Sequence, residues 1–428
     1  MITTYSIKKD FSILNAEWLF NTISGENPSN YLYTFIGRTE PWVVESEPPM
    51  PADNVDGFIT SWKNMIALKR VNYTDMSLAI KKNVWASGTV YDMYDDKDPL
   101  LNEEVYFVIT SKNKIYKCLD NNGRAPSTVE PDSDSLTPWS TSDGYKWQLM
   151  YKISDSDMTK WNNDSVIPVK KLTSDDGSLQ WQIQEAAVPG TIDNIIVENG
   201  GSGYLQAPEI TIRGDGTGAI AEAIMNGDSI SKILIRSRGS GYTYANISIN
   251  GNAELRAVIS PVKGHGSNAV EELNGRYLII RSIFDKDETG TFPTDIAFRQ
   301  VGLIVNPLVR DGSEIAKSTA GIRQITDLSI TSASTNFIYN ETILNQNNDS
   351  TAIVSSKGDG IISITNINGS FNVGDSILGL SSGVSTTIDT VAEGNLKLYS
   401  GSLLYVENRE AVQRLDTQAE SYKIVVAF

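Results

Sequence analysis

The chain has 428 residues, 40% of them apolar, which is enough material to bury two or more hydrophobic cores in a multidomain protein. Its 36 basic and 52 acidic residues give a formal net charge of −16, and because an acidic surface repels phosphate backbones, nucleic acid is excluded as an expected partner. No apolar run is long enough to span a bilayer and none follows Lys8 and Lys9, so we expect a protein made and kept in a cytosol, without a membrane partner.

Cysteine and tryptophan are distributed unevenly. The single cysteine, Cys118, excludes an internal disulfide and a paired-thiolate zinc site, and we expect it to be a small buried apolar side chain. All eight tryptophans lie in the first 181 residues, which marks a first domain at this end of the chain. They are Trp18, Trp42, Trp62, Trp85, Trp139, Trp147, Trp161 and Trp181.

The first predicted element is a helix. Phe11, Leu14 and Trp18 recur at helical spacing after Asp10 or Ser12, either of which is a suitable N-cap. The pattern predicts one amphipathic helix that packs through this apolar stripe.

The next segments alternate between loops and short elements. The proline-rich residues 41–51 have no apolar period and predict a linker or a loop that follows the surface. A second short helix is expected over residues 57–69. Residues 105–110 and 114–119 are β-type runs separated by a short polar turn, and Asn-Asn-Gly at 121–123 closes the second run, so we predict a β-hairpin.

From Thr191 the chain consists of glycine-rich repeats. Residues 195–204 are echoed by residues 233–242, 38 positions later, and both copies end in Gly-Ser-Gly-Tyr. Ile-Thr-Ile-Arg-Gly at 210–214 then matches Ile-Ser-Ile-Asn-Gly at 247–251. Each unit is predicted to be strand, glycine turn, tyrosine and strand, with the tyrosine ring covering the turn, and two such units could pack face to face.

A second, different pair of repeats follows. Residues 337–344 match residues 371–378 at an offset of 34, and both continue into β-type runs that end near Val354 and Ile388. Residues 326–394 carry no helical period, so we predict one or two small β-modules.

The C-terminal segment contains two further apolar runs, residues 403–407 and 422–428. Because free termini are usually polar, we expect the last strand to be tied into a sheet.

Several motifs resemble reactive sites, but each has a simpler interpretation. Asp-Gly-Thr-Gly at 215–218 matches half of an aspartic-protease pair, but that chemistry needs two carboxylates and no second copy exists. The glycines at 200–203 and 239–241 are not followed by Lys-Ser/Thr or by a helix that would hold a phosphate. All three motifs are interpreted as turns.

The lone histidine, His265, lies between Gly264 and Gly266 and has no second histidine or cysteine pair for a transition metal. As a general base it would need a nucleophile that the sequence does not nominate.

An acidic cluster lacks the spacing of an EF-type calcium loop and predicts a charged, solvated loop, with calcium as the alternative. Its members are Asp92, Asp95, Asp96 and Asp98. We therefore assign no catalytic, cofactor-binding or metal residue, and no cofactor.

Four longer motifs carry a family resemblance. They are residues 33–42 (Tyr-Thr-Phe-Ile-Gly-Arg-Thr-Glu-Pro-Trp), 62–70, 85–95 and 116–123, with shorter matches at 125–128, 141–147 and 150–153. Further matches are residues 264–266, 272–273, 298–304 and 306–307, then 404–409, Arg414 and 418–420. In this order they resemble the baseplate wedge subunit of T-even-type contractile-tailed bacteriophages. The resemblance covers residues 1 to about 172, about 263 to 322 and about 395 to 428.

The resemblance implies a mostly β, non-enzymatic subunit that forms a homodimer within each wedge and contacts other wedge proteins. Its expected location is the tail baseplate of the virion, after assembly in the host cytoplasm. The chain departs from the family through its two repeat-bearing insertions, whose Gly-Ser-Gly-Tyr texture is similar to modules in tail proteins of marine cyanobacterial phages.

Together these observations predict a mainly β, β-sandwich-type multidomain protein with a few short helices. The predicted segments are a core 1–172, an inserted module 173–262, a second core segment 263–325, an inserted module 326–394 and C-terminal strands 395–428. An acidic, turn-rich β-protein without a convergent site suits an assembly component that works through large interfaces. The alternatives are a module that binds a host carbohydrate and a tail-associated glycosidase.

Four residues of the first segment combine charge and aromatic surface in the way that interface anchors do. They are Arg38, Trp42, Trp62 and Arg70. We interpret them as half-buried structural residues in preference to contact residues.

Overall fold

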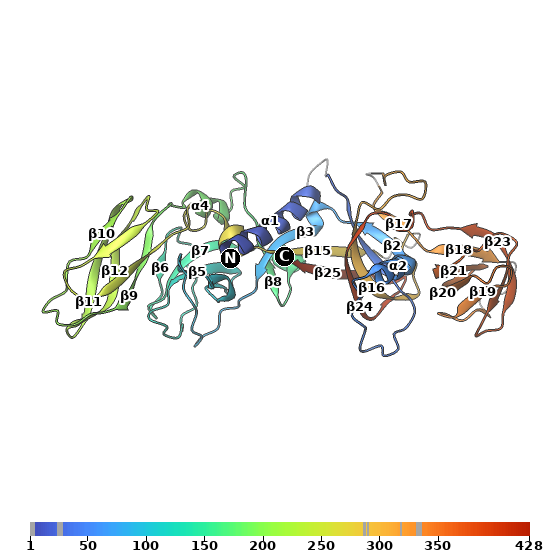
Figure 1. Cartoon of the computed structure of the whole chain (residues 1–428), viewed down its shortest axis with the longest axis horizontal. Coiled ribbons are helices and arrows are strands. Elements are labelled where there is room, and N and C mark those ends of the chain that lie inside the picture. The colour runs from blue at the N-terminus through green and yellow to red at the C-terminus, as the bar shows by residue number, and fades with distance from the viewer. Residues whose placement is uncertain (1–4, 24–28, 286–287, 289–290, 317–318, 331–335) are drawn as a thin grey trace. The chain divides into compact units, whose positions relative to one another are not determined.

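The computed structural model describes residues 5–23, 29–285, 288, 291–316, 319–330 and 336–428. Strands predominate in it and the helices are few and mostly short, which confirms the predicted mainly β fold class (Figure 1). The chain divides into two compact units. Unit 1 comprises residues 1–20, 77–279 and 425–428, and unit 2 comprises residues 21–76 and 280–424, so the predicted segment 1–172 contributes to both.

Unit 2 is built on a five-stranded antiparallel sheet of order β17-β2-β1-β16-β24. The strands are β1 (Leu32–Gly37), β2 (Met65–Arg70), β16 (Ile296–Val305), β17 (Gly321–Arg323) and β24 (Ser402–Arg414). Every residue of the central strand β1 is buried, as expected for a strand that is covered on both faces. The three chain segments that carry the family resemblance thus meet in one sheet, and neither insertion contributes a strand to it.

The proline-rich loop follows the free side of β24 and forms no helix or strand. The Trp42 indole nitrogen donates to the Arg409 carbonyl at 2.9 Å, and the Asn408 amide donates to the Pro49 carbonyl at 2.8 Å. Of the two predicted alternatives, the surface-following loop is therefore correct. Because an uncovered edge strand invites pairing with other chains, the loop protects this edge.

The first helix, α1 (Tyr5–Ile23), is confirmed, but its predicted N-cap was wrong, and so was the predicted burial of Leu14 and Trp18. The side chain of Phe11, the third residue of the predicted stripe, lies outside the described part of the structure. Asp10 and Ser12 lie inside the helix. Leu14 and Trp18 are 59% and 61% exposed. The buried side chains in the described part of the stripe are Ile13, Ala16, Leu19 and Ile23. Both sets have helical spacing, and tertiary packing selected the one that the sequence pattern did not favour.

The second helix, α2 (Val55–Asn64), is also real but ends earlier than predicted. Its N-cap is Asn54, whose side chain accepts a hydrogen bond from the Gly57 amide at 2.8 Å. The second half of the predicted helix is strand β2, and its first four residues are fully buried. The prediction failed there because pairing with β1 and β17 outweighs local helical preference.

Unit 1 contains the predicted hairpin in a four-stranded sheet of order β4-β5-β7-β6. Its strands are β4 (Phe107–Ile109), β5 (Lys114–Asp120), β6 (Trp139–Ser140) and β7 (Lys146–Lys152). Cys118 on β5 is fully buried against a core that includes Trp147, which confirms its predicted role. The short helices of this unit are α3 (Asp155–Trp161), α4 (Leu179–Glu185) and α5 (Ala269–Glu272), and two 3-10 turns are η1 (Tyr73–Asp75), in unit 2, and η2 (Leu101–Glu103).

A further sheet has the order β25-β15-β3-β8. Its strands are β3 (Met76–Lys81), β8 (Val166–Pro168), β15 (Tyr277–Phe284) and β25 (Glu420–Ala427). The prediction that the C-terminal strand is tied into a sheet is confirmed, and the amide of Phe428 itself donates to the Arg276 carbonyl at 3.1 Å. Like the five-stranded sheet, this one takes its strands only from the three resembling segments.

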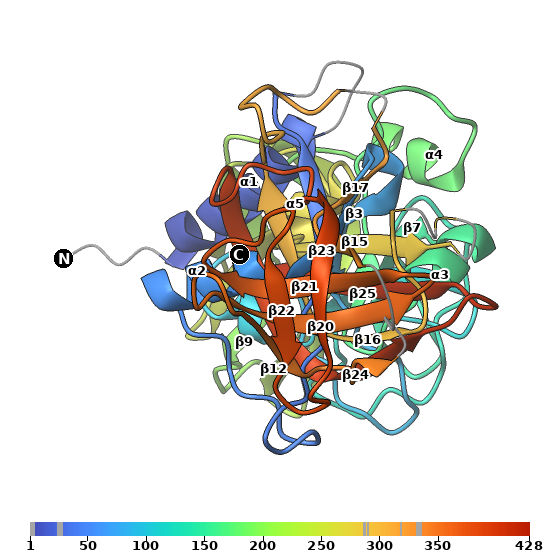
Figure 2. The same ribbon diagram turned by 90° about the vertical axis from the view of Figure 1, so that its right-hand side faces the viewer.

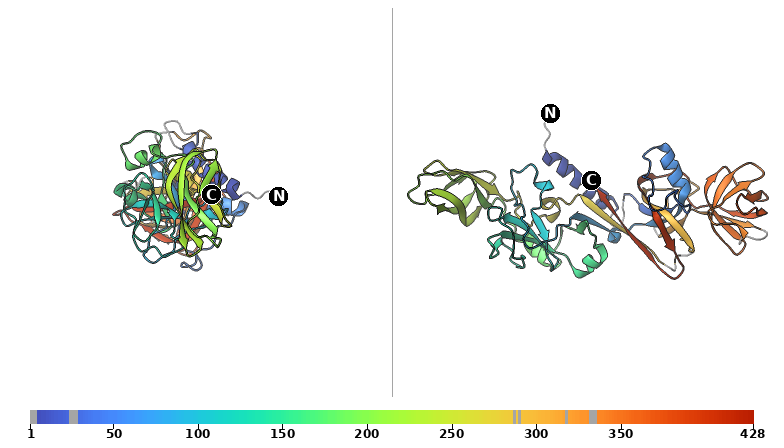
Figure 3. Two further views of the ribbon diagram at one scale, coloured as in Figure 1. Left: turned by 90° about the vertical axis from the view of Figure 1, so that its left-hand side faces the viewer. Right: turned by 90° about the horizontal axis from the view of Figure 1, so that it is seen from below.

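The first insertion forms its own small β-module (Figure 3, left). Its strands are β9 (Ile192–Asn199), β10 (Thr211–Gly214), β11 (Thr217–Asn226), β12 (Ser229–Ser240), β13 (Ala245–Ser248) and β14 (Glu254–Ile259). Each repeat supplies three strands, and pairing crosses between repeats, because β9 pairs with β14, β12 with β11 and β10 with β13. The equivalent residues Thr211 and Ser248 lie opposite each other, which indicates a local two-fold axis. The repeats therefore exchange strands and do not simply stack.

The repeat tyrosines pack on glycines of the opposite repeat. A Cβ atom on Gly216 would lie 2.4 Å from the Tyr242 ring, and one on Gly251 would lie 2.3 Å from the Tyr204 ring. The Tyr204 hydroxyl also accepts a hydrogen bond from the Ala253 amide at 2.9 Å. The predicted covering of turns by tyrosine is thus found, with the turn belonging to the other repeat.

The second insertion is a single closed six-stranded barrel of order β18-β21-β20-β19-β22-β23 (Figure 2). Its strands are β18 (Thr326–Ile330), β19 (Thr342–Asn345), β20 (Thr351–Gly358), β21 (Ile361–Asn368), β22 (Ser376–Gly379) and β23 (Ser385–Ala392). Equivalent residues again face each other, Leu328 opposite Ile362 and Leu344 opposite Leu378. Closure leaves no free strand edge, and the repeat phenylalanines Phe337 and Phe371 fill the interior.

Candidate functional site

The lone histidine is the centre of a buried charged cluster in unit 1. Its loop is tight, because a Cβ on Gly264 would meet the Val188 backbone at 2.6 Å and one on Gly266 would meet Ile183 at 2.4 Å. Both glycines have φ close to +90°, a region that other residues avoid. The backbone therefore fixes the position of His265, whose side chain is 2% exposed.

Two carboxylates flank the imidazole. Its Nε2 atom lies 2.5 Å from Asp193 Oδ2 and its Nδ1 atom lies 3.5 Å from Glu272 Oε2. The edge of the ring meets the Tyr94 ring at a centroid distance of 4.9 Å. Asp193 is the second residue of β9, the first strand of the first inserted module, whereas Glu272 is the last residue of helix α5 in the core. The histidine therefore lies where the module and the core join.

Each carboxylate also has a cationic partner. Arg238 on β12 forms a salt bridge with Asp193 and donates from Nε at 2.9 Å, while Lys117 on β5 forms a salt bridge with Glu272. The Lys117 side chain is fully buried and its ammonium lies 4.8 Å from the Tyr94 ring centroid. The cluster is thus a continuous chain of polar contacts that runs from Lys117 through Glu272, His265 and Asp193 to Arg238.

The electrostatics follow from burial and pairing. Burial alone would raise the pKa of Asp193, but His265 and Arg238 hold it well below the ordinary range of an aspartate. Burial likewise opposes ionisation of Glu272, and Lys117 followed by His265 lowers its pKa. Burial lowers the pKa of Lys117, and Glu272 counteracts this effect. Both carboxylates are therefore held in the ionised form.

The charged groups of the cluster are held in fixed pairs. The carboxylate oxygens of Glu272 are taken up by Lys117 and by the Gly266 amide, which donates at 2.8 Å. Within the described residues, no group of three or more histidine, cysteine, aspartate or glutamate side chains is placed to hold a metal ion. A buried pair that loses one partner is strongly destabilised, so the cluster fixes the module on the core in one geometry.

Two surface ion pairs extend the same joint. Arg256 on β14 holds Asp95 with two hydrogen bonds of 2.6 and 2.8 Å, and Lys232 lies 2.9 Å from Asp120. A planar guanidinium matches a carboxylate in this two-point geometry.

The other members of the acidic cluster, which was predicted to be a charged, solvated loop, contact separate partners. Asp92 lies 3.4 Å from Arg124, Asp98 accepts from the Leu100 amide at 2.8 Å, and Asp96 accepts from the Ile259 amide at 3.2 Å.

Of the three motifs predicted as turns, residues 200–203 lie between strands, as expected. The other two were partly wrong, because strand β11 begins at Thr217 and strand β12 runs on to Ser240. Asp215 accepts hydrogen bonds from the Thr243 amide at 2.8 Å and from its hydroxyl at 2.5 Å, which lowers the pKa of this exposed carboxyl to about 2. The glycines of both Gly-Ser-Gly-Tyr motifs include residues with positive φ, namely Gly201, Gly203, Gly239 and Gly241.

Of the four anchor-type residues, Arg38, Trp42 and Arg70 are half-buried, as predicted, whereas Trp62 is fully buried. Trp62 is 1% exposed in the core of unit 2, and the Arg38 guanidinium lies 4.0 Å from the Trp42 ring centroid. The Arg70 guanidinium lies 4.2 Å from the Tyr31 ring centroid.

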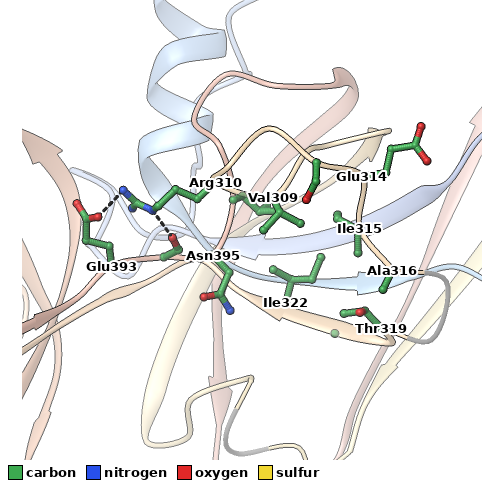
Figure 4. Close-up of a pocket in the computed structure, with 13 residues that line it drawn as sticks. Val309, Arg310, Glu314, Ile315, Ala316, Thr319, Ile322, Glu393 and Asn395 are labelled. Carbon is green, nitrogen blue, oxygen red and sulfur yellow. Dashed lines mark hydrogen bonds and ion pairs between the residues drawn. The ribbon is translucent and has the colours of Figure 1, made fainter.

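Two cavities of similar volume are also present. One, of about 660 Å³, lies in unit 2 where the barrel returns to the core, and Val309, Ile315 and Ile322 line its apolar side (Figure 4). At its rim Arg310 pairs with Glu393 at 2.5 Å, and both side chains are about half exposed. The second cavity, of about 650 Å³, is a groove in unit 1 beside α1.

The meeting of His265, Asp193 and Glu272 was missed by sequence reasoning, which treated the histidine as isolated. The glycines on either side of it were the available signal for a constrained loop. Asp193 lies 72 positions away in the inserted module, and nothing local marks it as a partner.

The chain matches no protein-family model and no curated protein sequence. In the described part of the chain, no helix is both long enough and apolar enough to cross a membrane.

Proposed function

We propose that the chain is a structural, non-enzymatic subunit of the baseplate wedge of a contractile phage tail. In this proposal a homodimer cross-links other wedge proteins, and the protein is located in the tail baseplate of the virion after assembly in the host cytoplasm. It uses no cofactor, and its specificity comes from broad complementary surfaces.

The proposal rests on which segments of the chain supply the strands of the core sheets. The predicted core segments 1–172, 263–325 and 395–428 contain the family resemblance, and they supply all nine strands of the five-stranded sheet and of the sheet containing β3. The pairing of β1 with β16, and of β16 with β24, joins all three segments. Among the described residues, the strands of each insertion pair only with one another, as expected for additions to an existing core.

The test is to locate the protein in purified tails. Imaging and mass spectrometry of intact tails should find it at the baseplate, in an even number of copies per wedge. Tails that assemble normally when its gene is deleted would contradict the proposal. Sedimentation of the pure protein tests the dimer separately, since a monomer at micromolar concentration would contradict it.

The carbohydrate-binding alternative assigns the recognition to the two inserted modules. The structural proposal predicts no hits when the full chain is applied to a glycan array. Reproducible binding that is lost on deletion of either module would favour the alternative.

A further inference from the structure

The groove beside α1 combines apolar and acidic surface within unit 1. Its walls are formed by α1, by the loop between residues 94 and 102, and by residues 261–272 around helix α5. A volume of about 650 Å³ accommodates a few side chains of another protein.

The apolar part of the groove is solvent-exposed. Leu14 on α1 is 59% exposed and Val262, which also lines the groove, is 90% exposed. Trp18 lies one helical turn beyond Leu14 and is 61% exposed. Large apolar side chains gathered at a groove are typical of a contact surface, whereas single exposed ones are not.

The polar part of the groove has an excess of negative charge. Six carboxylates line it, Glu17, Asp95, Asp96, Asp98, Glu271 and Glu272, against the single lysine Lys263. Arg256 pairs with Asp95 and Lys117 pairs with Glu272. For the other four, no salt bridge to another described residue is found.

In the free protein, the excess negative charge of the groove disfavours the ionised form of its carboxylates. Burial, followed by Glu271, raises the pKa of Glu17, although Lys171 opposes the shift. Burial and Asp95 raise the pKa of Asp96, although the Ile259 amide opposes the shift. A cation placed in the groove would relieve this repulsion.

We infer that this groove binds a segment of a partner protein that presents lysine or arginine next to apolar side chains. The positive groups would lie against Glu17, Asp96 and Glu271, and the apolar ones against Leu14 and Val262. A second copy of this chain, with its net charge of −16, is repelled from an acidic groove and is the less complementary occupant. The inference about the chemistry of the groove does not depend on the proposed function. Identifying its occupant as another tail protein does rest on the proposed function.

The test measures binding of a defined probe to the full-length chain. The probe is a short fluorescent peptide with lysine and leucine at helical spacing. Two control peptides replace the lysines by glutamate or the leucines by serine. Fluorescence anisotropy should show that the probe binds and that the two control peptides do not. Raising the salt concentration from about 50 to about 300 mM should weaken binding of the probe.

Two charge-matched triple variants separate the groove from the general acidity of the surface. The groove variant is E17Q/D96N/E271Q, and the control variant is D359N/E410Q/D416N, which neutralises three exposed carboxylates elsewhere. We expect the groove variant to weaken binding about tenfold and the control variant less than about twofold. Leu14→Lys, at an exposed position that tolerates substitution, should also weaken binding about tenfold because it adds a like charge.

Three results would overturn the inference. Equal weakening by the two triple variants would show unspecific attraction to an acidic protein. Self-association that is abolished by Leu14→Lys would assign the groove to a second copy. Micromolar binding of Ca²⁺ that is lost in the groove variant would make it a cation site. If the peptide does not bind the groove, the baseplate proposal is not affected. If the protein is absent from purified tails, the inference that the groove binds a basic peptide is not affected.

Discussion

The buried cluster makes a quantitative prediction for Lys117→Met. The Lys117 side chain is 0% exposed and that of its partner Glu272 is 5% exposed. Removing the lysine leaves a buried carboxylate without its salt-bridge partner, although the Gly266 amide still donates to it. Breaking a buried pair in this way costs about 3–5 kcal/mol. The pair between Arg236 and Glu222, with both side chains more than half exposed, is the matched control. Arg236→Met should cost less than about 1 kcal/mol.

The assay must report on unit 1, because a chain of two units need not unfold in a single step. Hydrogen exchange of the β5 amides gives the local free energy of opening in unit 1. Denaturant unfolding gives the free energy of unfolding of the whole chain. The double variant K117M/E272Q removes the stranded charge but keeps an oxygen that accepts from the Gly266 amide. It should recover at least about 1–2 kcal/mol of the loss.

The reasoning would be refuted if Lys117→Met cost no more than Arg236→Met. It would also be refuted if the double variant were no more stable than the single one. In the first case the pair carries little energy, and in the second the loss comes from packing of the lysine stem and not from charge.

Three further outcomes are expected from the same structure. Burial and neighbouring carboxylates raise the folded-state pKa of Glu104 to about 7, so ionisation of Glu104 at higher pH destabilises the folded protein. Glu104→Gln should therefore raise Tm at pH 8 but not near pH 4. Gly216→Ala should cost about 1–3 kcal/mol in denaturant unfolding because the added Cβ meets a tyrosine ring, whereas Gly358→Ala, with no atom within 4 Å, should change stability by less than about 0.5 kcal/mol. Asp193 and Glu272 have lowered pKa values, so their stabilisation is present above their unfolded pKa of about 4 and is lost as pH falls through the folded values; acid unfolding should be shallower in the double variant described above.

The features predicted correctly from the sequence are those encoded locally. The hairpin of β4 and β5 follows from two alternating β-type runs and a short turn. The two repeat pairs were visible because glycine, tyrosine and phenylalanine recur at fixed offsets, and each pair became one module. Such signals need only the nearest residues along the chain.

The features that failed depend on distant partners. Leu14 and Trp18 form as good a helical stripe as Ile13 and Ala16, and only packing decides which one is buried. Residues 65–70 have helical composition, but strands from two other parts of the chain flank them. The same applies to the charged cluster, whose members come from positions between 117 and 272 and meet only through the tertiary fold.

The two insertions illustrate how a core sheet can accept added modules. Each module pairs its strands internally and relates its two repeats by a local two-fold axis, so neither needs hydrogen bonds from a core strand. A module that satisfies its own backbone still needs a fixed attachment if it is to present a defined surface. In the first insertion the attachment is ionic and buried, through Asp193, His265 and Glu272. Buried ion pairs add little net stability compared with apolar packing, but they strongly penalise any other arrangement, because a displaced module would leave unpaired charges behind. The cluster therefore favours a rigid joint over a flexible one, as an assembly component that works by shape would require.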